Sequence, residues 1–157
     1  MSTYPPTKST DSNSSKYAAA RAVSNSRKFD HITPILKSLH WLKIRQRIQY
    51  KIISLTYNVL QLQTNQTTYL NSLLSIQSST RTRSSDVVTL LRPTNPSRLK
   101  ITDRSFQIHA PALWNSLSPT LRQSSLSNPS HAPISLSPAQ FHSKLKTYLF
   151  LKAFPPD

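Results

Sequence analysis

The sequence predicts a mainly α-helical protein, a small irregular helical bundle around one central helix at about residues 44–62. The longest periodic stretch of the chain carries apolar residues on two opposed sides of that helix. One row at helical spacing consists of Ile48, Ile52, Leu55, Val59 and Leu62, and the other of Tyr50, Ile53, Tyr57 and Leu60. Because a helix that is apolar on two sides normally packs between two layers, we expect this one to be central and both rows to be buried.

Short helices should flank the central helix on either side. Thr33 followed by Pro34 is typical of an N-cap with proline at the first helical position, and Trp41 is the expected buried anchor of that helix. After the central helix, Thr67 or Thr68 can cap a short helix whose buried residues would be Tyr69, Leu70, Leu73, Leu74 and Ile76.

The character of the chain changes after Ile76. A short β-ribbon is predicted at about 87–101, where the β-rich run from Val87 to Leu91 is followed by a Pro-containing turn. Thr102 or Asp103 should then cap a helix that continues through Trp114 to Leu117, broken or kinked by Pro111. Residues 118–137, dense in Ser and Pro, are predicted to be a flexible loop.

The last helix has the clearest start signal. Ser137 and Gln140 form a capping-box pair around Pro138, and Pro155–Pro156 should stop the helix near Phe154. Its predicted buried face consists of Phe141, Leu145, Tyr148 and Leu149.

The predicted domain organisation is simple. Residues 1–16, rich in Ser, Thr and Pro, are expected to be a disordered lead-in, and residues 17–154 a single helical module that is helical at 18–23 and broken at 24–26. The chain contains no glycine, so turns and helix ends that need a positive φ should use Asn or be avoided.

The charge balance suggests polyanionic partners. Twenty Lys and Arg face five Asp, a formal net charge of +15, which favours nonspecific binding of RNA or DNA through backbone phosphates. The cations that cluster most strongly lie in two groups. They are Lys43, Arg45, Arg47 and Lys51 on the central helix, and Arg81, Arg83, Arg92, Arg98, Lys100 and Arg104 around the predicted ribbon.

The motifs of catalysis are missing from the sequence. No two acidic residues are adjacent or at helical spacing, and without glycine neither a nucleophile elbow nor a Gly-rich phosphate loop can form. Without Cys, Glu or closely spaced His, a metal site is not expected either. We therefore predict a protein that is not an enzyme and needs no cofactor.

Two runs of the chain are distinctive, FDHITPILKSLHW at 29–41 and APALWNSL at 110–117. They are the most specific parts of a resemblance that covers roughly residues 18–154. Over that range the chain resembles the C-terminal, post-palm region of reverse transcriptases from non-LTR (LINE-type) retrotransposons. It implies a helical module beside the polymerase thumb that supports the enzyme and touches template or primer. The paired catalytic aspartates of that family lie upstream of this region and are absent from this chain.

Two alternatives to nucleic-acid binding stay open. The chain could instead be a protein-interaction module that docks through the central helix, or an element remnant with no selected function. No membrane-spanning segment or secretory signal is expected, so the protein should not be secreted. The sequence does not choose between nucleus and cytoplasm.

Overall fold

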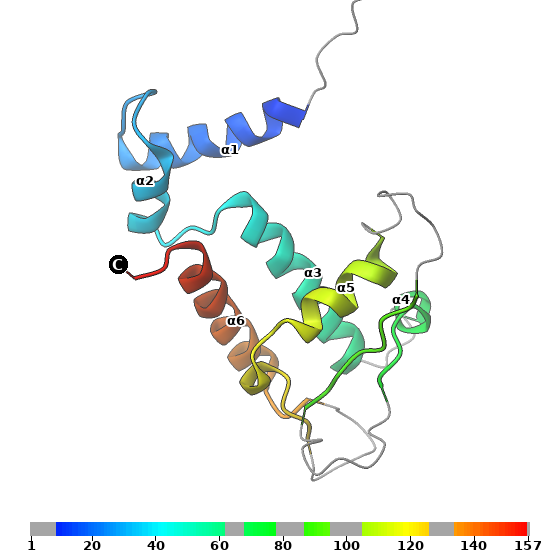
Figure 1. Cartoon of the computed structure of the whole chain (residues 1–157). Coiled ribbons are helices and arrows are strands. Elements are labelled where there is room, and N and C mark those ends of the chain that lie inside the picture. The colour runs from blue at the N-terminus through cyan, green and yellow to red at the C-terminus, as the bar shows by residue number, and fades with distance from the viewer. Residues whose placement is uncertain (1–8, 62–67, 78–86, 95–104, 126–133, 157) are drawn as a thin grey trace, which may run out of the picture. The chain divides into compact units, whose positions relative to one another are not determined.

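A computed structural model describes residues 9–61, 68–77, 87–94, 105–125 and 134–156, and the side chains of these except at 9–16 and 68. The chain is mainly helical, as predicted (Figure 1). Its elements are α1 (Ser9–Ser24), α2 (Ile32–Ser38), α3 (Ile44–Gln61), α4 (Thr68–Ser72), α5 (Phe106–Asn115), the 3-10 turn η3 (Pro119–Leu121) and α6 (Pro138–Ala153).

The chain folds into two compact units. The first comprises residues 1–47 and 149–157, and the second residues 48–148, so that α3 and α6 each contribute to both. In the first unit, a small core is formed by Ala20, Ile35, Leu36, Ala153 and Phe154.

Both helices at the start of the first unit end without glycine. Asn25, with φ 52°, follows α1, and His40, with φ 53°, follows α2. In each case the next N–H bonds back to the carbonyl five residues earlier, Ser26 to Arg21 at 3.0 Å and Trp41 to Leu36 at 2.9 Å. These are two Schellman caps, and Asn25 confirms the expectation that Asn replaces glycine. His40 in the same role was not foreseen.

Two predictions about α2 and the residues that follow it were wrong. Helix α2 begins at Ile32 with His31 at the N-cap position and no side-chain cap, so Thr33 and Pro34 lie inside its first turn. Trp41 lies beyond the helix and is only half-buried, because the helix has already ended in its Schellman cap. Helix α1 starts at Ser9, inside the predicted lead-in, whereas residues 1–8 lie outside the described part of the chain.

Helix α3 was predicted correctly, but its two apolar rows differ in burial. The row of Ile53, Tyr57 and Leu60 is buried, whereas Ile48 and Leu55 of the other row are 54% and 38% exposed. The covered face takes in Thr56 and Val59, and the Thr56 hydroxyl donates to Ile52 O at 2.9 Å, so its polarity costs little there. Leu62 lies outside the described residues.

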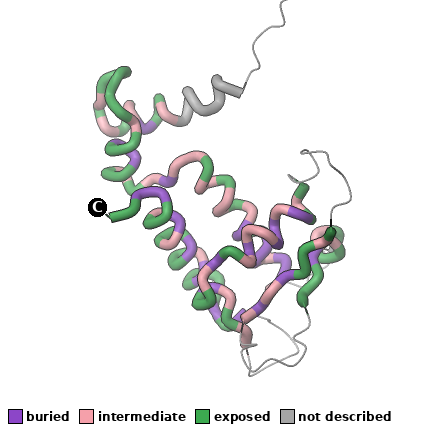
Figure 2. The backbone as a smooth tube through the Cα atoms, viewed as in Figure 1, coloured by how far each residue is buried: buried purple, intermediate pink, exposed green. Residues whose placement is uncertain are grey.

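Aromatic rings fill the core of the second unit. Tyr57 stacks on Phe141 with centroids 4.0 Å apart, and Trp114 stacks on the same Phe141 at 5.9 Å. Phe141 lies on α6, whose start follows the prediction, since Gln140 N–H donates to the Ser137 hydroxyl at 3.4 Å. Along α6, buried positions alternate with exposed ones, as in a helix with one covered face, whereas in α5 only Gln107 is exposed (Figure 2).

The segment from Val87 to Leu90 forms isolated β-bridges with segments outside the predicted ribbon. Leu90 pairs with Ile76, and Val87 with Gln123 of the predicted loop. The Asn115 side chain holds Leu90 on both sides, donating from Nδ2 to Leu90 O at 2.8 Å and accepting at Oδ1 from its N–H at 3.0 Å. The expected partner strand at 95–101 lies outside the described residues.

Three further expectations differ from the structure in detail. Helix α5 runs unbroken through Pro111 and begins after Ser105, which gives no side-chain cap. The predicted loop at 118–137 contributes Leu121, Ile134 and Leu136 to the core, because its ends pair with each other at Ser124 and Ile134. In and after α4, Leu74 is buried, but Tyr69 and Ile76 are 75% and 50% exposed.

Candidate nucleic-acid interface

Four of the predicted cations lie at the start of α3. The N–H of Arg47 donates to Lys43 O at 3.0 Å, so the hydrogen-bond pattern of the helix begins at Lys43. Lys43, Arg47 and Lys51 follow one another at intervals of four residues and therefore lie along one side of the helix, while Arg45 projects from a different side. The basic group is thus spread over two sides of α3.

Two of these cations are held over aromatic rings within the first unit. The ammonium of Lys43 lies 4.9 Å from the ring centroid of Phe154, and the guanidinium carbon of Arg47 lies 5.3 Å from that of Trp41. Such contacts are worth about 0.5–1 kcal/mol near a surface. Lys43 and Arg47 are half-buried and have a structural role whether or not they also meet a phosphate.

The remaining described members of the predicted set face solvent. Arg45, Lys51 and Arg92 are exposed, and none of them pairs with a carboxylate among the described residues. Within that part of the chain the Asp30 carboxylate is turned onto the backbone, where its Oδ2 accepts from Arg27 N–H at 2.7 Å. Of the predicted cations that the structure describes, these three are therefore the ones left accessible to a ligand.

Most of the second predicted group falls outside the described residues. Arg92 alone of that group is described, and the others are Arg81, Arg83, Arg98, Lys100 and Arg104. A phosphate-binding patch at 81–104 therefore stays a prediction.

The structure adds cations that the sequence analysis did not select. Arg27 and Lys28 are exposed in the segment between α1 and α2, and Lys144 and Lys146 are exposed on α6. Arg122 is half-buried in the second unit, where its Nε donates to Leu117 O at 3.1 Å and burial lowers the pKa of its guanidinium. A short run of basic residues, such as Arg27–Lys28, was the available signal for the first pair.

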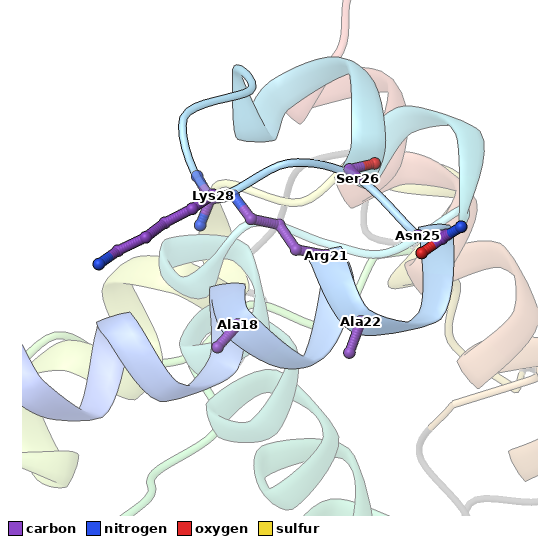
Figure 3. Close-up of a pocket in the computed structure, with 6 residues that line it drawn as sticks. All are labelled: Ala18, Arg21, Ala22, Asn25, Ser26 and Lys28. Atoms are coloured by element: carbon purple, nitrogen blue, oxygen red, sulfur yellow. The ribbon is translucent and has the colours of Figure 1, made fainter.

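A pocket of about 440 Å³ opens between the last turns of α1 and the segment that follows (Figure 3). Arg21 rises from α1 toward the segment that carries Lys28, and both side chains line the pocket with Ala18, Ala22, Asn25 and Ser26. The Arg21 Nη2 donates to Asp30 O at 3.1 Å, while its buried Nε has no hydrogen-bond partner. Two of the six residues that line the pocket are therefore cationic.

One arrangement in the second unit brings a serine to a histidine. His142 Nδ1 lies 3.3 Å from the hydroxyl oxygens of both Ser54 and Tyr50, and these bonds tie α3 to α6. Within the described part of the chain no carboxylate orients the imidazole. The two hydroxyls share one ring nitrogen, and the arrangement forms a packing contact between α3 and α6.

Metal-ligand clusters and membrane-spanning helices are not found among the described residues. No three His, Cys, Asp or Glu side chains there are grouped so that they could hold a metal ion. No helix in the same residues has the length and apolar character needed to cross a bilayer.

Comparison of the chain with protein-family models, with curated proteins and with solved structures finds no match in any of the three.

Proposed function

We propose that the chain is a non-catalytic segment, derived from a retrotransposon reverse transcriptase, that binds nucleic acid nonspecifically through backbone phosphates. The observation that carries this proposal is the net charge of +15 together with exposed cations on α3 that have no carboxylate partners among the described residues. Unneutralised cations attract the phosphates of DNA and RNA irrespective of base sequence. The origin rests on the resemblance of residues 18–154 to the post-palm region of LINE-type elements.

The salt dependence of binding tests the proposal. Fluorescence anisotropy with a labelled duplex of about 20 base pairs should show log K falling linearly with log salt, by about 0.9 per phosphate contact. Duplexes of different sequence should bind with similar affinity. Salt-independent binding, or no binding at low salt, would contradict it.

A matched pair of double variants tests whether α3 forms the interface. Arg45→Gln with Lys51→Gln should weaken binding and flatten the salt slope by up to about two contacts. Lys144→Gln with Lys146→Gln removes the same charge from exposed positions on α6 and should leave the slope nearly unchanged. Equal losses in both variants would mean that net charge alone binds the duplex, with no interface on α3.

A second candidate function is docking on another protein, which the apolar side of α3 favours. Ile48 and Leu55 are partly exposed there beside Lys51, although both were expected to be buried. Affinity capture from nuclease-treated extract separates the two proposals. A defined protein retained after nuclease treatment, and lost in an Ile48→Gln, Leu55→Gln variant, would favour docking.

A further inference from the structure

The connection between α1 and α2 displays the most exposed large apolar side chain among the described residues. Phe29 is 92% exposed. Single exposed apolar residues are common on proteins and need no special role. Phe29 differs because its backbone is fixed and its neighbours are charged.

A tight turn fixes the backbone of Phe29. The Asp30 N–H donates to Arg27 O at 3.1 Å, and the Arg27 N–H donates to the Asp30 carboxylate at 2.7 Å, so Lys28 and Phe29 occupy the two central positions. Arg21 of α1 also holds the turn, through its bond to Asp30 O. The ring is therefore presented by a backbone that is ordered before any partner binds.

The charges around the ring favour an anionic partner. Arg27 and Lys28 directly precede Phe29 and are exposed, whereas the Asp30 carboxylate is occupied by the backbone of the turn. Lys28 also lines the 440 Å³ pocket together with Arg21 (Figure 3). Phe29 thus directly follows two exposed cations in the turn, and one of them, Lys28, lines a pocket that Arg21 also lines.

We propose that the turn Arg27–Asp30 binds single-stranded nucleic acid, with an unpaired base stacked on Phe29 and the adjoining phosphates on Arg27 and Lys28. Single strands expose base faces that can stack on aromatic rings, while in a duplex these faces are already covered by neighbouring bases. This inference rests on the proposed nucleic-acid binding and adds a preference for single strands that the charges on α3 do not provide.

Affinities of the full chain for two probes test the inference, one an oligothymidylate of about 20 nucleotides and the other a duplex of mixed sequence. Stacking contributes about 1–3 kcal/mol per base, so Phe29→Ala should weaken single-strand binding on the order of 5- to 150-fold. Duplex binding should change by less than about twofold, because no base face is available there. Phe29→Tyr keeps a stacking ring and should retain the single-strand affinity.

Tyr69 provides the matched control. It is an aromatic residue, 75% exposed on α4, and its neighbours Thr68 and Leu70 carry no charge. Tyr69→Ala should therefore leave single-strand affinity unchanged. An equal loss in Tyr69→Ala and Phe29→Ala would overturn the assignment of the turn.

The remaining outcomes separate this inference from the broader function. If wild-type protein binds duplex with the expected salt slope but Phe29→Ala binds single strands normally, the turn has no such role while phosphate binding stands. If wild-type protein binds neither probe, both proposals fail. If Phe29→Ala loses affinity only for vesicles of phosphatidylserine and phosphatidylcholine, the turn is a membrane contact and the inference is wrong.

Discussion

Tyr57 of α3 and Phe141 of α6 lie nearly parallel, with ring centroids 4.0 Å apart and 13° between their planes. The Tyr57 side chain is fully buried, and its hydroxyl donates to Leu136 O at 2.7 Å. Gln61 Nε2 donates both to the Tyr57 hydroxyl, at 3.0 Å, and to Leu136 O, at 3.3 Å. At Tyr57, stacking thus joins α3 to α6, and hydrogen bonding joins α3 to the segment that precedes α6.

The protein should lose stability at high pH because of Tyr57. Burial raises the pKa of its hydroxyl above the ordinary 10.0, and this effect outweighs the opposing hydrogen bond from Gln61. Above about pH 10 the unfolded chain releases this proton while the folded chain keeps it, so the free energy of unfolding falls as pH rises. Below pH 10 this contribution is fully present.

Urea unfolding at about pH 8 and pH 11 measures the effect. Tyr57→Phe should cost about 1 kcal/mol at the lower pH, since Gln61 still donates to Leu136 O. The variant should then lose less stability than the wild type between the two pH values. Identical losses would show that Tyr57 ionises as readily in the folded state.

Asn115 should be important for stability because its side-chain amide bonds both backbone groups of Leu90. Asn115→Ala leaves the N–H and C=O of Leu90, which is 1% exposed, without these partners. A buried group left unsatisfied costs about 1–3 kcal/mol. Thermal unfolding should show a large loss for Asn115→Ala and almost none for Asn71→Ala, an exposed asparagine on α4.

Asn115→Asp makes the same test more specific. The substitution keeps Oδ1 as an acceptor but places a second oxygen where Nδ2 faces Leu90 O at 2.8 Å. The variant should therefore be no more stable than Asn115→Ala. Stability near that of the wild type would mean that the amide donor is unimportant.

The His40→Gly variant should be more stable than the His40→Ala variant. Both substitutions remove the ring that stacks on Phe150 at 5.4 Å, so their difference reports the backbone alone. A side chain in the left-handed region costs roughly 1 kcal/mol that glycine avoids. In chemical unfolding, the free energy of unfolding of His40→Gly should exceed that of His40→Ala by about this amount.

The order should reverse inside α2. Lys37 is exposed in the helix, where glycine is about 1 kcal/mol less favourable than alanine. Lys37→Ala should therefore be more stable than Lys37→Gly. The same order at both positions would argue against a strained backbone at His40.

Substitution of Arg47 should destabilise the protein more than substitution of Arg45, because only Arg47 contacts an aromatic ring. Arg47→Gln removes the contact with the Trp41 ring and should cost about 0.5–1 kcal/mol. Arg45→Gln, at an exposed position two residues away, should change stability very little. Calorimetric unfolding measures the stability of both variants. Equal losses would contradict the cation–π assignment.

Apolar periodicity predicted helices α3 and α6, but the expectation that both apolar rows of α3 are buried was wrong. Ile48 and Leu55 have the same spacing as a buried row, yet only packing against other segments decides burial, and none of the described segments covers them fully. Thr56 was missed for the converse reason, since a local bond to Ile52 O lets a polar residue occupy the covered face.

The sequence predicted which cations could belong to the candidate site, but it did not predict which side chains they contact in the fold. Lys43 and Arg47 were selected for their charge, but the ring beneath Lys43 belongs to Phe154, far along the chain, and only folding brings them together. The turn at Phe29 was missed because one aromatic beside two cations has no periodicity. Its order depends on the reciprocal bonds between Arg27 and Asp30.

The two tryptophans are distributed so that each compact unit contains one. Trp114 lies in the second unit with no exposed surface, and its Nε1 donates to Val88 O at 3.0 Å. Trp41 lies in the first unit, half-buried beneath a guanidinium. A buried indole fluoresces at shorter wavelength than a solvent-exposed one. The fluorescence of single-tryptophan variants would therefore follow the unfolding of each unit. Each compact unit thus contains its own fluorescent reporter, and comparing the two signals would show whether the units unfold together or separately.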